Sequence, residues 1–309
     1  MYQALVLLAL AIVCYRGVQS DTQKIGDEAQ ANTSVVGVNQ TRAPLSPRLK
    51  FFDDTYTGPA LPNKDGERHM VIVIASYNNK DWYQGNLDSV FSQSYKNYHV
   101  VYVDDCSADG TGELVKHYIE EKQQQDRVTL ICNKNRIGAL ANYYNIIHMC
   151  NDGDIIVQLD GDDRLADETV LATVNKAYAD SSTWLAYSQF TRWPKMLIGW
   201  NKPHVKDTKG NRGLSPSHLH TFYAKLFKKI KREDLMYEGD FFQMTWDMAI
   251  MLPMVEMASE EHVGFMPEVL YIYNDDNPIN DHRVDKTLQS TLDKFIRTKE
   301  KYDALETLF

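Results

Sequence analysis

The stretch VQLDGDDR, residues 157–164, places three aspartates directly after an apolar run. An apolar run without alternation indicates a strand that is buried on both faces of a sheet. Asp160, Asp162 and Asp163 at the end of such a strand repel one another unless a cation, hydrogen-bond donors or open water surrounds them. The partner of these carboxylates therefore decides what this part of the protein does.

Three earlier stretches of the chain are also apolar runs of the kind that forms buried strands. Apolar runs at 69–75, 99–103, 128–132 and 154–159 alternate with helical spacing at 81–93, 111–122 and 139–149. This order predicts an α/β fold with a mostly parallel central sheet that is flanked by helices. Ligands bind outside the carboxyl ends of the strands in such sheets. The polar loops that follow these strands, at 76–79, 104–110 and 160–163, are therefore expected at a ligand site.

The second half of the chain is less regular, and we expect an irregular C-terminal half there. Helices are expected at 167–179, 218–231, 246–257 and 285–308, strands at 184–191 and 269–273, and an irregular loop at 192–216.

The N-terminus has the pattern of a targeting segment. The apolar run at 4–14 is 11 residues long, whereas about 20 are needed to span a bilayer. Small residues at 18–20 then resemble a cleavage site, which predicts a signal peptide over 1–20, with a short uncleaved anchor as the alternative. Residues 21–66 are expected to form a polar stem, and its sequons at Asn32 and Asn39 favour the secretory pathway lumen or secretion.

Composition narrows the class of protein. The 309 residues include 33 basic and 42 acidic side chains, giving a net charge of −9, which argues against a nucleic-acid partner. After the predicted signal peptide three cysteines remain, Cys106, Cys132 and Cys150. They allow either one disulfide and one thiol or three buried thiols.

Four blocks in order carry a resemblance to a known family. IASYNN (74–79), VDDCSADGTGE (103–113), NRIGALANYYN (135–145) and VQLDGDD (157–163) resemble family 2 glycosyltransferases with the GT-A fold. The resemblance covers about residues 68–285. It implies a GT-A domain over 67–285, with a donor-nucleotide half at 67–165 and an acceptor and catalytic half at 166–285, before a C-terminal helix at 286–309.

The resemblance implies a metal site at the aspartates. In this family an Asp-x-Asp signature holds a divalent metal that bridges the diphosphate of the donor, so Asp160 and Asp162 are expected to bind Mn²⁺ or Mg²⁺. Gly161 would leave room for the donor, and His282 would add a ligand. The alternatives are an acidic turn in which Asp163 caps the next helix, and an exposed loop histidine.

The resemblance also assigns the nucleotide pocket and the catalytic base. The residues expected to contact the nucleotide sugar are Ala75, Ser76, Tyr77, Asp104, Asp105, Arg136, Asp160 and Gly161. Asp105 would accept from the imide of uracil, and Arg136 would bind the diphosphate or be a surface charge. Asp247 is the expected base, with Asp240 and Glu238 as fallbacks, although Trp246 stands where the family usually has glutamate.

These expectations describe a metal-dependent inverting enzyme. It would move a hexose-type sugar, most simply from UDP, to a hydroxyl of a glycan, glycoprotein or glycolipid, with possible membrane proximity through the N-terminus. The alternative is an inactive GT-A domain that binds glycans or nucleotides. A nucleotidyltransferase is disfavoured because IASYNNKD (74–81) lacks the glycines of that class.

Overall fold

A computed structural model describes residues 66–203 and 216–309, and both ranges belong to one compact unit. The predicted signal peptide and nearly all of the predicted stem lie outside the described residues. Within the described ranges no helix is both long and apolar enough to cross a membrane.

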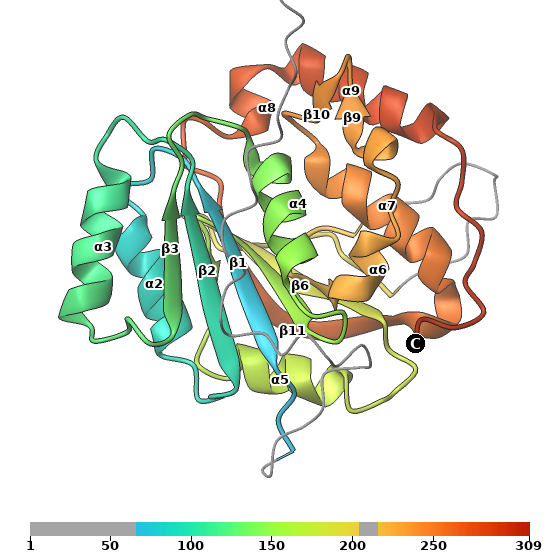
Figure 1. Cartoon of the computed structure of the whole chain (residues 1–309), viewed down its shortest axis with the longest axis horizontal. Helices are drawn as coiled ribbons and strands as arrows, with labels where there is room; N and C mark the ends of the chain where they lie inside the picture. The colour runs from blue at the N-terminus through green and yellow to red at the C-terminus, as the bar shows by residue number, and fades with distance from the viewer. Residues whose placement is uncertain (1–65, 204–215) are drawn as a thin grey trace, which may run out of the picture. The chain divides into compact units, whose positions relative to one another are not determined.

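The first half of the predicted sheet is confirmed. Its strands run parallel in the order β3-β2-β1-β4, and Figure 1 shows β3, β2 and β1 side by side. The elements are β1 (Met70–Ser76), α2 (Tyr83–Phe91), β2 (Tyr98–Asp104), α3 (Thr111–Glu121), β3 (Val128–Cys132), α4 (Ala139–Met149) and β4 (Ile155–Asp160). Ser76 pairs with Asp104, and Ala75 pairs with Asp160. The polar loops therefore leave the sheet at the same edge.

The second half extends the same sheet instead of forming an irregular region. The order continues β4-β8-β6-β11-β5, with β7 on the edge of β6, and the pairs β4–β8, β8–β6 and β11–β5 are antiparallel. Its strands are β5 (Arg164–Leu165), β6 (Leu185–Trp193), β7 (Leu197–Ile198), β8 (His220–Tyr223) and β11 (Val263–Asn274). The whole sheet is thus mixed, although its donor half is parallel.

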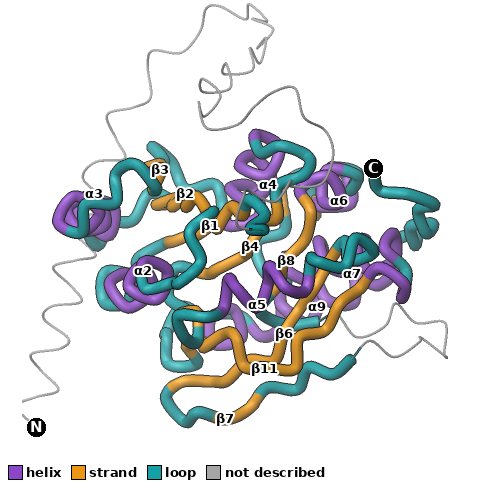
Figure 2. Tube along the Cα trace, turned by 90° about the horizontal axis from the view of Figure 1, so that it is seen from below, coloured by secondary structure: helices purple, strands orange, loops and turns teal. Residues whose placement is uncertain are grey.

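Helices and short segments complete the fold. Figure 2 shows α4 and α6 on one side of the sheet and α2 and α5 on the other. The remaining elements are α5 (Val170–Ala177), α6 (Ala224–Lys228), η1 (Arg232–Leu235), β9 (Met236–Tyr237), β10 (Asp240–Phe241), α7 (Trp246–Ala258), η2 (Glu260–His262), α8 (Asp281–Val284) and α9 (Lys286–Thr298).

Two predicted helices are wrong in part. Residues 218–231 contain strand β8 and only a short helix α6, because residues 220–223 are buried between β4 and β6. The C-terminal helix ends at Thr298 rather than near Leu308. Beyond it the Tyr302 N–H donates to Glu256 (3.0 Å) and its hydroxyl to Asp234 (2.7 Å), so tertiary hydrogen bonds replace helical ones.

The three cysteines in the described part of the chain are free thiols. Cys106 and Cys132 are exposed, and Cys150 is buried. The alternative with one disulfide is therefore not formed, and burial of all three thiols holds for Cys150 alone.

Candidate active site

The aspartate turn after β4 is fixed through its backbone. The Asn86 amide, fully buried on α2, donates to the carbonyl oxygens of Asp160 (2.9 Å) and Asp163 (2.8 Å). The Gly161 N–H donates to the carbonyl oxygen of Ala75 (3.1 Å). Because these donors use backbone oxygens, the carboxylates of the turn remain available to other partners.

Two of these carboxylates have partners within the protein. The Tyr271 hydroxyl donates to Asp163 Oδ2 (2.6 Å), and the Asn274 N–H donates to Asp163 Oδ1 (2.6 Å). The Asn277 amide donates to Asp162 Oδ2 (2.7 Å). Asp163 therefore joins the turn to β11, and it does not cap the following helix, which begins at Val170.

Asp160 has no such partner. Across residues 66–203 and 216–309 no side chain or backbone group donates to its carboxylate. Only the backbone of Asp160 forms hydrogen bonds: its carbonyl oxygen accepts from Asn86, and its N–H donates to the Tyr271 hydroxyl (3.3 Å). Burial, with Asp162, Asp247 and Asp281 nearby, raises the pKa of Asp160 well above its usual range. A cation beside Asp160 would remove this repulsion.

A histidine converges with two of the aspartates. One ligand atom each from Asp160, Asp163 and His218 lies within 4.8 Å of the others. The His218 ring stacks on Tyr271 (4.6 Å between centroids), and its Nδ1 is buried with no hydrogen-bond partner in the described ranges. Burial lowers the pKa of His218 to about 3, so the ring is neutral. Two carboxylates and a neutral imidazole suit a divalent ion such as Mn²⁺.

This group differs from the predicted ligand set in two members. Asp162 binds Asn277, and His282 lies 3.6 Å from Asp275 with its side chain 42% exposed. Asp163 and His218 take their places in the converging group. Asp163 already accepts two short hydrogen bonds, but each carboxylate oxygen retains a second lone pair.

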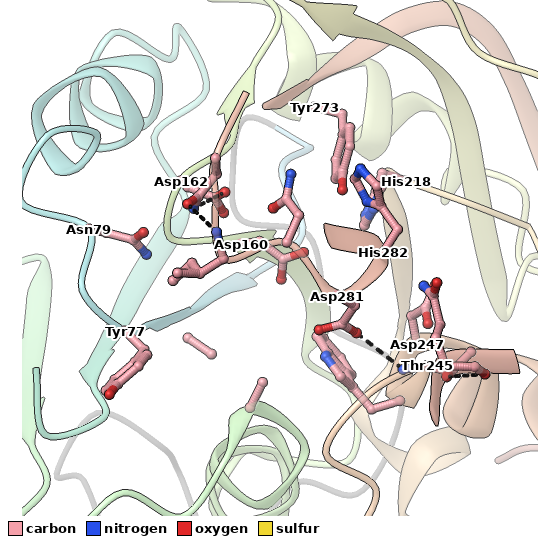
Figure 3. A pocket seen from close by; sticks show the side chains of 17 residues that line it. Tyr77, Asn79, Asp160, Asp162, His218, Thr245, Asp247, Tyr273, Asp281 and His282 are labelled. Atoms are coloured by element: carbon pink, nitrogen blue, oxygen red, sulfur yellow. Dashed lines mark hydrogen bonds between the residues drawn. The ribbon is translucent and has the colours of Figure 1, made fainter. Parts of the chain in front are cut away.

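A pocket of about 250 Å³ opens beside these aspartates. Figure 3 shows Asp160 and Asp162 across it from Asp247 and Asp281. Its lining residues are Ala75, Tyr77, Asn79, Ala139, Asp160, Asp162, His218, Thr245, Trp246, Asp247, Tyr273, Asn277, Ile279, Asn280, Asp281, His282 and Gln289. Six of the predicted site residues are among them: Ala75, Tyr77, Asp160, Asp162, Asp247 and His282. The others, Ser76, Asp104, Asp105, Arg136 and Gly161, lie outside this lining.

The carboxylate of Asp105 organises the loop after β3. It accepts from the Asn133 amide (2.8 Å) and from the N–H groups of Ile137 (3.0 Å) and Gly138 (2.8 Å). Burial acts to raise the pKa of Asp105, but these donors outweigh it and leave the pKa below its usual value. Contact with a uracil imide stays a prediction that would use its remaining acceptor capacity.

Two other predicted donor contacts are also placed. The Arg136 guanidinium lies 3.9 Å from the centroid of the Tyr77 ring, so it covers one face of a ring that was expected to contact the nucleotide sugar. Asp104 is buried and accepts from the Ser107 N–H (3.2 Å). Roles for these residues in donor binding stay predictions.

Protein atoms pack closely around Gly161, and the room that it would leave for a donor stays a prediction. A Cβ at this position would lie 2.6 Å from Ser76 Cβ and 2.7 Å from Asn79 Nδ2. Ser76 cannot move easily, because its Oγ accepts from the Tyr102 hydroxyl (2.8 Å) and from Asn79 (3.0 Å). Protein atoms therefore already exclude a side chain at Gly161, whether or not a donor is bound.

Gly161→Ala should destabilise the protein by about 1–3 kcal/mol, because overpacking forces the turn or Ser76 to shift. The measurement is the urea unfolding midpoint at constant m-value. Gly85→Ala is the matched control: its Cβ would meet only the flexible Arg164 side chain, and helix α2 favours alanine. Equal midpoints for Gly161→Ala and the parent would contradict the packing argument.

The predicted base lies at the start of α7. Asp247 is in the first turn of that helix and lines the pocket. The fallbacks Asp240 and Glu238 are exposed, and neither lines the pocket. Trp246 forms part of the wall, where its ring stacks on Tyr143 (4.8 Å).

A second acid near Asp247 was missed. Asp281, the first residue of α8, lines the pocket and accepts from the Thr245 N–H (3.3 Å). Burial chiefly, together with Asp247, raises the pKa of Asp281 to about 6. Asp281 directly precedes His282, the predicted metal ligand, and this position is the feature of the sequence that points to it.

Residues 71–235, more than half of the chain, match the family described as "Glycosyl transferase family 2". The chain belongs to glycosyl transferase family 2.

Curated relatives match over a shorter region. The "Putative glycosyltransferase EpsE" of Bacillus subtilis (strain 168) is 34% identical over 92 residues, 30% of this chain and 32% of that protein. The "UDP-Glc:alpha-D-GlcNAc-diphosphoundecaprenol beta-1,3-glucosyltransferase WfaP" of Escherichia coli is 35% identical over 92 residues, 30% of this chain and 34% of that protein. The family 2 chain thus spans about a third of these relatives.

Solved structures confirm the GT-A fold. The mannosyltransferase PcManGT from Pyrobaculum calidifontis, in complex with GDP-Man and Mn²⁺, matches with a TM-score of 0.52 at 17% identity, covering 79% of this chain and 69% of that chain. S. aureus TarS 1-349, in complex with UDP-GlcNAc, matches with a TM-score of 0.50 at 15% identity, covering 68% and 59%.

Proposed function

We propose that this family 2 protein is a metal-dependent, inverting glycosyltransferase. It moves a hexose-type sugar from a nucleoside diphosphate, UDP in the first instance, to a hydroxyl of a glycan, glycoprotein or glycolipid. The observation that carries the proposal is one pocket whose lining includes Asp160, Asp162 and His218 together with Asp247. The complexes of the structural neighbours, UDP-GlcNAc in TarS and GDP-Man with Mn²⁺ in PcManGT, support a nucleotide-sugar donor.

The donor side of the pocket would hold the nucleotide diphosphate. Asp160, Asp163 and His218 would hold a divalent ion, which supplies positive charge to the departing diphosphate. Ala75 and Tyr77 at the end of β1 line the same pocket and would receive the nucleoside. Arg136, stacked on Tyr77, would add charge near the phosphates.

The acceptor side would supply the base. In an inverting transfer the acceptor oxygen bonds to the anomeric carbon as the bond to the diphosphate breaks, and the hydroxyl proton must pass to a base. Asp247 is a carboxylate that faces the pocket from the wall opposite Asp160. We assign the proton to Asp247 because the fallback acids Asp240 and Glu238 do not line the pocket. The other pocket acid, Asp281, already accepts from the Thr245 N–H, and it is the rival candidate for this role.

A thermal-unfolding screen of nucleotide sugars tests the donor. We expect a UDP-sugar to stabilise the full chain in Mn²⁺ and to lose most of this effect in EDTA, since a ligand at 100 times its Kd adds about 2.7 kcal/mol. GDP-mannose is the comparison donor. If a UDP-sugar stabilises the protein equally in EDTA and in Mn²⁺, the proposed metal site is contradicted. If only GDP-mannose stabilises the protein, the proposed UDP donor is contradicted.

Product release separates the enzyme from the binding module. The donor found in the screen is incubated with Mn²⁺ and the protein, and free nucleoside diphosphate is measured with and without candidate acceptors. We expect slow release to water and faster release with the right acceptor. Tight donor binding without any release, under all acceptors, would favour the inactive GT-A domain.

A further inference from the structure

The end of strand β6 carries a hairpin at the edge of the sheet. β7 pairs antiparallel with β6, with Ile198 opposite Thr191 and Leu197 opposite Arg192. The Gly199 N–H donates to the Phe190 carbonyl (2.8 Å), and Gln189 donates to the Asn201 carbonyl (3.0 Å). Figure 2 shows β7 at the outer edge of the described chain. The hairpin is therefore an ordered element with a fixed register.

The outer residues of this hairpin are apolar and exposed. We name as the apolar tip the residues Met196 (53% exposed), Leu197 (51%), Ile198 (63%) and Trp200 (63%). Trp200 packs edge-to-face on the buried Phe190 ring (5.0 Å), so the protein holds the indole in place while most of it faces outward. Four large apolar side chains within five positions form a patch, unlike single exposed residues elsewhere, and such patches mark interaction sites.

Charge identifies the partner of the apolar tip. Residues 192–203 contain Arg192, Lys195 and Lys202 and no acid, in a chain whose net charge is −9. Arg192 pairs with Asp275 (2.7 Å), whereas Lys195 and Lys202 are exposed and make no ion pair with a described residue. A two-fold dimer through this edge would bring the lysines of two copies together, which disfavours a second copy as the occupant.

A lipid surface with anionic headgroups can bind both the exposed apolar side chains and the lysines beside them. Apolar side chains enter the boundary between headgroups and acyl chains, and tryptophan favours the same depth. Lysines beside them gain from anionic lipids, by about fivefold in partition for each lysine. We propose that the apolar tip, with Lys195 and Lys202, docks this protein on an anionic bilayer surface.

The hairpin is connected to the walls of the pocket. The Asn201 amide donates to the carbonyl oxygens of Ser217 (3.0 Å) and His218 (3.1 Å), and His218 lines the pocket. On the other side of the hairpin, Arg192 binds Asp275, which is also 3.6 Å from His282. Docking would therefore hold the pocket near the bilayer and favour a lipid-anchored acceptor; this last step rests on the proposed function, but docking does not.

Vesicle flotation of the full chain tests the proposal without any transfer assay. The variant Leu197→Ser with Ile198→Ser removes two exposed aliphatic side chains that have no role in the pocket. The control Leu114→Ser with Val284→Ser removes two exposed aliphatic chains elsewhere (39% and 58% exposed). Vesicles of phosphatidylcholine with and without phosphatidylserine are used, and far-UV circular dichroism checks folding.

The hairpin variant and the control have the same N-terminus, so a difference in their vesicle binding measures the contribution of the hairpin. We expect the partition into phosphatidylserine vesicles to fall at least tenfold in the hairpin variant and to stay within twofold of the parent in the control. Lys195→Glu with Lys202→Glu should remove the preference for phosphatidylserine. Equal binding of hairpin variant and control overturns the proposal. A parent protein that does not bind either kind of vesicle also overturns the proposal. The same holds if the parent instead forms a dimer and the hairpin variant does not.

Discussion

Asp247→Asn should lower turnover by about 10²–10⁴-fold, the range that general-base catalysis contributes. Asparagine keeps the volume and one oxygen of Asp247 but cannot take the proton of the acceptor hydroxyl. Donor affinity should stay within about threefold of the parent, because the converging ligands Asp160, Asp163 and His218 lie at other positions. The measurements are turnover with saturating donor and acceptor, and donor affinity by calorimetry.

Asp281→Asn is the matched control for Asp247→Asn. It changes a carboxylate in the same pocket in the same way, at a residue whose oxygen accepts from the Thr245 N–H. If the large loss occurs in Asp281→Asn and not in Asp247→Asn, the base is Asp281. If Asp247 only complements the dipole of α7, its variant loses about 0.3–1 kcal/mol of stability and keeps near-normal turnover.

Sequence reasoning located the donor half of the site because of a property of parallel sheets. The carboxyl ends of neighbouring parallel strands meet at one edge, so the order of strands and loops places Ala75 beside Asp160 without further information. The same reasoning could not find Asn86. Its buried amide supports the aspartate turn from the middle of α2, and a helical asparagine carries no signal of a distant partner.

The acceptor half depends on topology that local patterns do not encode. His218 reaches Asp160 because β8 inserts between β4 and β6, whereas helical spacing and lysines in 218–231 had predicted a helix. A segment that is buried on both faces has no alternation that distinguishes it from a buried helix turn. Without strand β8 the sequence pattern does not place His218 beside the aspartates, so it leaves His282 as the predicted ligand.

Asp160→Asn should abolish transfer and make UDP binding independent of Mn²⁺. Asp160 is the one residue that the predicted ligand pair and the converging group share, and its carboxylate accepts no hydrogen bond from the described residues. Losing even an outer-shell partner of a metal costs about 10–100-fold in affinity, so loss of this carboxylate should exceed 100-fold. Isothermal titration of Mn²⁺ in the presence of UDP measures the change.

The metal-free protein gives a second, opposite readout for Asp160→Asn. Burial and the neighbouring carboxylates disfavour an ionised Asp160, so the neutral amide should raise the melting temperature in EDTA while removing the stabilisation by Mn²⁺ with UDP.

His218→Gln and His282→Gln then separate the two ligand sets, because the convergence of His218 with Asp160 predicts the larger loss of Mn²⁺ affinity for His218→Gln. A larger loss for His282→Gln would restore the ligand set that the sequence predicted. If Asp160→Asn binds Mn²⁺ as tightly as the parent, the proposed metal site at this edge of the sheet is wrong.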